Sequence, residues 1–152
     1  MAEIAIIMAT YNGERFLREQ IDSILDNSFK DIELHICDDG STDGTEAIAT
    51  EYVQKYRDKV FFHKNEKNLR VIKNFLVNIK RFDAPYYMLC DQDDFWLPEK
   101  IEHTLQFMKQ TEDGEHDVPT VVFGDAKMVD VNLKEYHPSF QKLNNLDTTK
   151  LD

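Results

Sequence analysis

The amino-acid sequence predicts an α/β fold, with a mostly parallel sheet and helices on both of its faces. Short apolar runs, each suited to a buried strand, alternate along the chain with longer segments whose apolar residues recur at helical spacing. This alternation is the pattern of parallel sheets built from right-handed crossovers. Polar residues gather directly after several of the apolar runs, where such sheets bind their ligands.

The first half of the chain supplies two strands and two helices. Residues 4–9 form a continuous apolar run, which suits a strand buried on both faces. Residues 14–25 carry an apolar stripe along one helical face. Residues 33–37 predict the second strand, and a turn-rich loop follows it. The next helix is expected to begin near Asp43 as its N-cap, with Glu46 three residues later in a capping-box pattern.

The remaining elements continue the alternation. Residues 60–63 and 86–90 are the expected third and fourth strands, and an apolar stripe at helical spacing over 71–79 lies between them. A further helix with a buried stripe is expected over 97–108. Residues 120–123 predict a fifth strand. We expect the first four strands to take the usual spatial order 3-2-1-4.

Length and charge narrow the classes of protein that the chain could belong to. The 152 residues carry 18 basic and 29 acidic side chains, so the net charge is 18 − 29 = −11. This acidic balance argues against a nucleic-acid-binding face, because neutralising phosphates requires Lys and Arg. No apolar run reaches the roughly 20 residues that span a bilayer, and the amino terminus does not resemble a signal peptide. Two cysteines are too few for a disulfide-rich scaffold.

Three polar clusters are expected at one edge of the sheet. They are Thr10-Tyr11-Asn12 after the first strand, Asp38-Asp39 after the second, and Asp91-Gln92-Asp93-Asp94 after the fourth. In the order 3-2-1-4 these strands are neighbours, and their carboxyl ends open into one crevice. The sequence therefore predicts a ligand site there.

The acidic segment after the fourth strand is the most informative of the three. Three carboxylates within four residues repel one another unless water or a cation shields them, and a hard divalent cation is a natural partner. The alternative is a solvated acidic loop that caps the next helix. Asp38-Asp39 can similarly be a simple turn, or it can accept hydrogen bonds from a base N–H or from ribose hydroxyls.

Other nucleotide-binding and catalytic motifs are missing from the sequence. There is no Gly-Lys-Ser/Thr loop, no set of spaced glycines after the first strand and no serine elbow. A calcium loop beginning at Asp39 would need Glu at its twelfth position, where Thr50 stands. The five histidines show no metal-binding spacing.

Four segments, taken in order and with their spacing, resemble the family 2 glycosyltransferases of the GT-A (Rossmann-like) fold. They read IAIIMATYNGERFLREQIDSIL, ELHICDDGSTDGT, NEKNLRVIKNF and YYMLCDQDDFWLPEKI. The form CDQDDFW is most similar to the bacterial branch that includes rhamnosyltransferases and other sugar transferases of cell-surface glycans. The resemblance covers about residues 4–132.

The resemblance implies nucleotide-binding roles for the first two clusters. Thr10, Tyr11 and Asn12 would line the pocket of the nucleotide, with Tyr11 stacked on the base. Asp39 would accept a hydrogen bond from the N–H of a pyrimidine, with Asp38 beside it.

The resemblance also implies roles for basic residues and for the acidic segment. Arg70 and Lys73 lie where the family often has a basic residue near the diphosphate. Asp91 and Asp93 would form the DxD pair, in which Asp91 contacts ribose or metal. Asp93 or Asp94 would bind Mg²⁺ or Mn²⁺, which bridges the diphosphate oxygens.

In the family, a sugar passes from a nucleotide-sugar to an acceptor by a metal-assisted, inverting displacement. The resemblance implies a UDP- or dTDP-sugar donor and a glycan or glycoprotein acceptor. A general base must deprotonate the acceptor hydroxyl, and we expect it to lie outside this chain. We therefore expect a donor-binding domain over residues 1–132 and a polar tail over 133–152 that begins a missing acceptor half. The expected location is the cytoplasm, with the inner face of the membrane as an alternative.

Two other functions remain open at the level of sequence. One is a catalytically incomplete nucleotide-sugar-binding or assembly module, which would bury its uncovered apolar surface by forming a homo-oligomer. The other is a phosphoryl-handling domain of the receiver or phosphatase type, because such domains also cluster aspartates on a parallel sheet. A phosphatase usually carries its Asp-x-Asp after the first strand, whereas here it follows the fourth.

Overall fold

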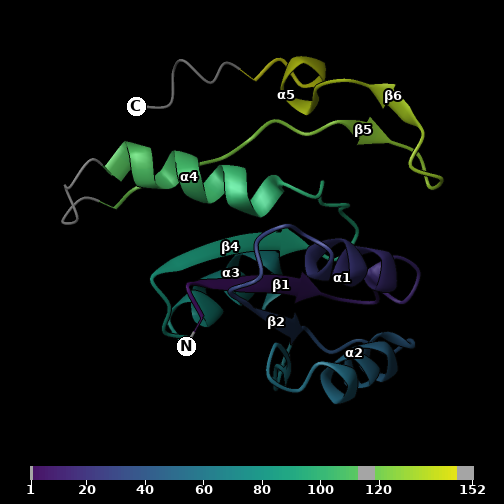
Figure 1. Ribbon diagram of the computed structural model, residues 1–152. Helices are drawn as coiled ribbons and strands as arrows, with labels where there is room; N and C mark the ends of the chain where they lie inside the picture. Colours follow the sequence, from purple (N-terminus) through teal and green to yellow (C-terminus); the bar gives the residue numbers. More distant parts are fainter. Residues whose placement is uncertain (1, 113–118, 147–152) are drawn as a thin grey trace. The chain divides into compact units, whose positions relative to one another are not determined.

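The computed structural model describes residues 2–112 and 119–146 (Figure 1). The chain divides into two compact units, Met1–Glu102 and His103–Asp152. None of the helices in the described ranges is long and apolar enough to cross a membrane.

A four-stranded parallel sheet forms the centre of the first unit. Its strands are β1 (Ile4–Thr10), β2 (Ile32–Asp38), β3 (Val60–Lys64) and β4 (Tyr86–Asp91). They lie in the order β3-β2-β1-β4, which confirms the predicted order. All seven residues of β1 are buried because this strand lies inside the sheet and is covered on both faces.

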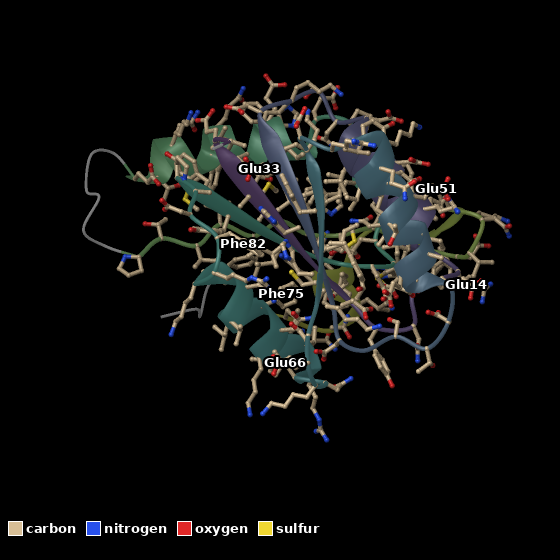
Figure 2. All side chains as sticks on the ribbon, turned by 90° about the horizontal axis from the view of Figure 1, so that it is seen from below. Glu14, Glu33, Glu51, Glu66, Phe75 and Phe82 are labelled. Atoms are coloured by element: carbon tan, nitrogen blue, oxygen red, sulfur yellow. The ribbon has the colours of Figure 1, made fainter. Side chains whose placement is uncertain are left out.

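Helices cover both faces of the sheet, as the sequence predicts. They are α1 (Leu17–Leu25), α2 (Thr45–Lys55) and α3 (Arg70–Ile79), and α4 (Lys100–Glu112) follows the fourth strand. Right-handed crossovers in this strand order place α1 and α2 on one face and α3 on the other. Helix α2, which carries Glu51, and α3, which carries Phe75, lie on either side of the strands (Figure 2). The Tyr52 hydroxyl donates to the Asp22 carboxylate at 2.7 Å and joins α2 to α1.

Helix α3 is present where predicted, but its orientation differs from a usual amphipathic helix. Asn74 and Asn78 are buried, whereas the side chains of Ile72 and Leu76 are 71% and 55% exposed. The reason is a hydrogen-bond network: Asn74 Nδ2 donates to the carbonyl of Cys37 at 2.8 Å, and Asn78 Nδ2 donates to Asn74 Oδ1 at 2.7 Å. This network turns the polar side of α3 toward the sheet, so the apolar stripe is not the buried face that its spacing predicts.

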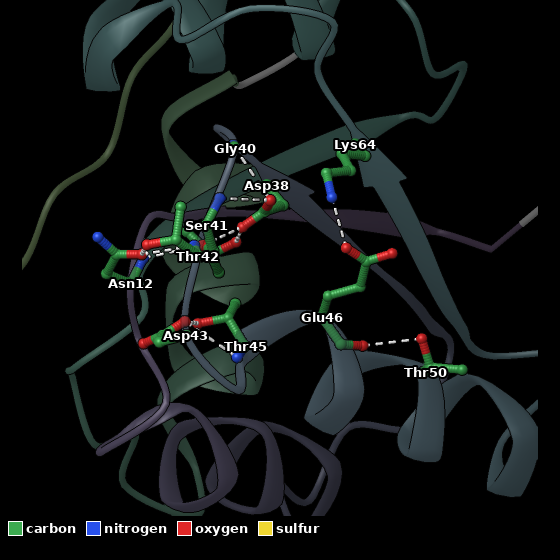
Figure 3. A network of polar contacts seen from close by, with 11 residues as sticks. Asn12, Asp38, Gly40, Ser41, Thr42, Asp43, Thr45, Glu46, Thr50 and Lys64 are labelled. Carbon is green, nitrogen blue, oxygen red and sulfur yellow. Dashed lines mark hydrogen bonds and ion pairs between the residues drawn. The ribbon is translucent and has the colours of Figure 1, made fainter.

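The capping box predicted at the start of α2 is wrong: the N-cap is Gly44, one residue after the predicted Asp43, and it makes no side-chain capping bond. Asp43 Oδ1 accepts hydrogen bonds from the N–H and the hydroxyl of Thr45, at 3.0 and 2.6 Å. The Glu46 carboxylate, however, forms an ion pair with Lys64 (Figure 3). The reciprocal half of the capping box is therefore wrong as well, because the end of β3 offers Glu46 a cationic partner.

The second unit contains a short antiparallel pair and a one-turn helix. Strands β5 (Met128–Val129) and β6 (Glu135–His137) pair, and α5 (Phe140–Leu143) follows with Ser139 as its N-cap. The predicted strand over 120–123 is wrong: this segment is irregular, and Val121 and Phe123 are 82% and 56% exposed. A short apolar run forms a strand only where it pairs with a neighbouring strand, and within the described residues 120–123 is not paired in either sheet. The predicted domain division at residue 132 stays a prediction.

Candidate functional site

The carboxyl ends of β1, β2 and β4 meet at one edge of the sheet, as the sequence predicts. Thr10 pairs with Asp38 across one side of β1, and Ala9 pairs with Asp91 across the other. A cavity of about 350 Å³ opens at this edge, which is within the lower part of the range for ligand pockets. Six residues proposed from the sequence line it: Thr10, Tyr11, Asp39, Arg70, Asp91 and Asp93.

Four other residues proposed from the sequence do not line this cavity: Asn12, Asp38, Lys73 and Asp94. Asn12 has a left-handed backbone, with φ of 51°, and its Oδ1 accepts from the N–H of Thr42 at 2.9 Å. It therefore ties the loop after β1 to the loop after β2 (Figure 3). Lys73 lies exposed on α3.

The cavity also includes residues that sequence reasoning did not select, notably Asn68, Asn74 and Gln92. Asn74 gave no clear signal, because it lies outside the apolar stripe of the segment 71–79, on the polar side of the helix with Asn78. Gln92 is an uncharged residue between Asp91 and Asp93, whose charges are the signal of that segment. Asn68 gave no sequence signal, since an asparagine before a helix is ordinary.

Asp38 stabilises the turn that follows β2, next to the cavity. The residue has no exposed surface. Its Oδ1 accepts from the hydroxyls of Thr10 and Ser41, and its Oδ2 accepts from the backbone N–H groups of Gly40 and Ser41, at 3.1 and 3.0 Å (Figure 3). A carboxylate has about four lone-pair positions, and all four are occupied. The contribution of Asp38 to the site is therefore to hold the turn after β2.

Asp39 joins the turn after β2 to the start of α3. Its Oδ1 accepts from the N–H of Leu69 at 2.8 Å and from Asn65 Nδ2 at 2.9 Å, and its Oδ2 accepts from the N–H of Arg70 at 2.7 Å. The side chain satisfies N–H groups that the first turn of a helix leaves free. Three of its four lone-pair positions are occupied, so one acceptor position remains for a ligand N–H.

Arg70 begins α3 with a left-handed backbone, with φ of 63°. This conformation costs a non-glycine residue about 1–2 kcal/mol, and such strain often occurs at functional sites. The Arg70 N–H is held by Asp39 and also donates to Asn68 Oδ1 at 3.1 Å. These hydrogen bonds offset the strain and keep a cationic residue at the wall of the cavity.

The acidic loop after β4 concentrates negative charge at the cavity. Removal from water raises the pKa of Asp91, and the nearby Asp93 raises it further. Removal from water is also the main cause that raises the pKa of Asp94, and the charges of Asp91 and Asp93 raise it further. Within residues 2–112 and 119–146, no three His, Cys, Asp or Glu side chains converge closely enough to hold a metal by themselves.

The acidic loop nevertheless suits a cation that takes part of its ligands from a substrate. Mg²⁺ is usually bound through one or two carboxylates, with waters and substrate phosphates in its other positions. The charge of Asp93 raises the pKa of Asp91, and a divalent cation bound between the two carboxylates would relieve this repulsion. Asp91 and Asp93 line the cavity and fit this requirement, whereas Asp94 does not line it.

A parallel α/β sheet with helices on both faces and polar strand ends around a cavity has the architecture of the GT-A class. The family model for glycosyl transferase family 2 matches residues 5–151. The chain therefore belongs to glycosyltransferase family 2. This membership gives no support to the receiver or phosphatase alternative.

Curated relatives are described as glycosyltransferases. The chain is 34% identical over 133 residues to an uncharacterized glycosyltransferase of Rickettsia bellii, and this match covers 86% of this chain and 18% of the relative. It is 33% identical over 146 residues to an uncharacterized glycosyltransferase of Methanocaldococcus jannaschii, and this match covers 91% of this chain and 48% of the relative. The chain thus spans less than half the length of these relatives.

Solved structures support the fold. S. aureus TarS 1-349 in complex with UDP matches with a TM-score of 0.61 and 25% identity, over 87% of this chain and 43% of TarS 1-349. The mannosyltransferase PcManGT from Pyrobaculum calidifontis, in complex with GDP-Man and Mn²⁺, matches with a TM-score of 0.59 and 19% identity, over 65% of this chain and 29% of that protein.

Proposed function

We propose that the chain is the donor-binding part of a glycosyltransferase that takes a UDP- or dTDP-linked sugar. The observation that carries the proposal is the cavity at the strand ends, which collects Tyr11, Asp39 and the acidic pair Asp91 and Asp93. The complex of TarS with UDP supports the choice of a uracil nucleotide. A glycan or glycoprotein is the proposed acceptor.

Each wall of the cavity suits one part of such a donor. Tyr11 is half exposed, and its ring offers a flat apolar face on which a base can stack. The remaining acceptor position of Asp39 suits the N–H of a pyrimidine. Arg70 offers a cation for the diphosphate, a role for which the guanidinium is well shaped. Lys73 is the second cation proposed here, one turn further along α3.

The acidic residues complete the proposed donor site. Asp91 and Asp93, with Asp94 next to them, would hold Mg²⁺ or Mn²⁺. When bound, such a cation offsets the charge on the departing nucleoside diphosphate. Without it, the three carboxylates would repel the donor's phosphates, which is why we propose that donor binding requires the metal.

We propose that transfer inverts the anomeric centre in a single displacement, in which the acceptor oxygen forms its bond as the bond to the diphosphate breaks. The acceptor hydroxyl must lose its proton to a general base. Asp125 and Asp130 are occupied in local turns: Asp125 accepts from the N–H of Ala126, and Asp130 accepts from the N–H of Asn132. Neither is assigned as the base, and we propose that the base does not lie among the residues that the structure describes.

Calorimetric titration with UDP- and dTDP-sugars, each with Mg²⁺ or Mn²⁺, tests the proposal. We expect binding only when metal is present, and GDP serves as the purine control. Asp93→Ala should abolish the metal-dependent binding, and Asp94→Ala should weaken it, because Asp94 neighbours the pair but does not line the cavity. Asp58→Ala is the matched control, because Asp58 is an exposed acid away from the cavity. Failure of the wild type to bind any pyrimidine nucleotide-sugar with either metal would refute the proposal.

One observation favours a second function, that of an assembly module. Helix α3 presents apolar side chains outward, including Ile72 and Leu76. Exposed apolar patches are typical of interaction surfaces. We propose that copies of this chain associate through α3 when nothing else covers it, and that such a module would retain donor binding without efficient transfer.

A further inference from the structure

Gln92 forms a two-point contact with the main chain of Tyr11. Its Oε1 accepts from the Tyr11 N–H at 2.8 Å, and its Nε2 donates to the Tyr11 carbonyl at 3.1 Å. The regular pairing of β1 with β4 ends where Ala9 pairs with Asp91, two residues before Tyr11 and one residue before Gln92. The side-chain amide therefore acts as a peptide group would and extends the connection between the two strands by side chain rather than by backbone.

Gly13 makes this contact sterically possible. A Cβ atom at Gly13 would lie 2.4 Å from Gln92 Oε1 and 2.7 Å from its Cδ. Real Cβ atoms do not approach other heavy atoms so closely, so any larger residue would push the amide away. Gly13 has no left-handed backbone that would itself require glycine. The close approach of Gln92 is thus a reason for glycine at this position.

The Gln92 contact joins two walls of the cavity that are 81 residues apart in the sequence. Tyr11 belongs to the wall proposed for the base, and the neighbours of Gln92 are the two acids of the wall proposed for metal and diphosphate. Tyr11 is 50% exposed, so packing alone holds its side chain weakly. Its position depends on how firmly its main chain is held.

We propose that Gln92 is a positioning residue that couples the base wall of the donor site to its acidic wall. The inference rests on the proposed function and deepens it. By fixing the Tyr11 main chain to the loop of Asp91 and Asp93, Gln92 keeps the ring at the angle that a base requires. Binding of metal and diphosphate at the acidic loop then favours binding of the base, and the reverse holds equally because such coupling is reciprocal.

Two variants break the contact in different ways. Gln92→Leu keeps the approximate size of the side chain and removes both hydrogen-bonding groups. Gly13→Ala leaves Gln92 unchanged and displaces its amide. Because the two variants change different residues, an effect that they share reports on the contact itself.

Hydrogen exchange measures the physical link without any ligand. In both variants we expect the Tyr11 amide to exchange about fivefold faster or more, the change expected for loss of one hydrogen bond. The amides of Ile6 and Ile36 in the sheet should keep their wild-type rates. An unchanged rate at Tyr11 in Gln92→Leu would overturn the proposal, whether or not the protein binds nucleotides.

Nucleotide affinity measures the coupling. We expect Gln92→Leu to lower the affinity for uridine, which carries no phosphate, by about fivefold. The affinity for UDP in the presence of Mn²⁺ should fall by at least as much. In a Tyr11→Ala background the same change should cause no further loss for uridine. Unchanged uridine binding, or a further loss in that background, would show that Gln92 does not act through Tyr11. If the wild type binds no uracil compound, the proposed function fails, and the exchange rates still decide the link.

Discussion

Replacing Asp39 by Asn tests whether this residue is a structural support as well as a ligand acceptor. The Asp39 carboxylate accepts three hydrogen bonds, from Leu69, Asn65 and Arg70. An asparagine has one oxygen, which can serve Leu69 and Asn65, and its NH₂ group then faces the N–H of Arg70. One hydrogen bond to a charged group is lost, which costs about 1.5–3 kcal/mol. The Arg70 N–H retains Asn68 as an acceptor, which limits the penalty.

We therefore expect Asp39→Asn to lower the free energy of unfolding by about 2 kcal/mol. For a protein of this size, this loss lowers the midpoint of urea unfolding by about 1 M. Urea titration followed by circular dichroism measures the midpoint, and hydrogen exchange at Leu69 and Arg70 locates the effect at the start of α3. The control is Asp58→Asn, which removes the same charge from an exposed side chain and should change stability by less than about 0.5 kcal/mol. Equal stability of the two variants would refute the capping role of Asp39.

Three further predictions address charge, strain and surface. Burial, with Arg81 and His35 nearby, lowers the pKa of His63 to about 4, so unfolding takes up protons and stability should fall as pH drops from about 6.5 toward 4. Partial exposure of His63 limits the loss of stability to about 1–2 kcal/mol. Urea titrations at pH 7 and 5 should show a smaller difference in the free energy of unfolding for His63→Phe than for the wild type. An equal difference in the two proteins would exclude His63 as a cause. Arg70→Gly should raise stability by up to about 1 kcal/mol while weakening UDP more than uridine in calorimetry, and equal weakening of both would argue against a diphosphate contact. Leu76→Glu should reduce self-association measured by light scattering, a prediction contradicted if the wild type is already a monodisperse monomer.

Much of the sheet could be predicted because its information is local. Residues 4–9 are apolar without interruption, which a strand inside a parallel sheet requires, and this strand is buried throughout. The ends of the strands were equally readable, since polar residues cannot continue a run that is buried on both faces. Thr10, Asp39 and Asp91 were located in this way, and all three line the cavity.

Other parts of the site depended on partners distant in the sequence. Asp38 and Asp39 are adjacent and chemically identical, yet one has every lone pair occupied and the other keeps one free. Glu46 was predicted to cap its own helix, but Lys64 lies close enough to bind it. Nothing in either local sequence distinguishes these outcomes.

The sequence by itself determined the order of the strands and helices from β1 to α4, the edge at which polar residues meet, and the chemical types available there, because periodicity and strand ends are properties of short segments. The tertiary structure alone decided which side of α3 faces the sheet, which acids remain free to accept a hydrogen bond, and that Gln92 reaches Tyr11. The physical reason is that a hydrogen bond is directional and short. Whether two groups make one depends on the backbone that brings them together, and in these cases that backbone comes from segments far apart in the chain.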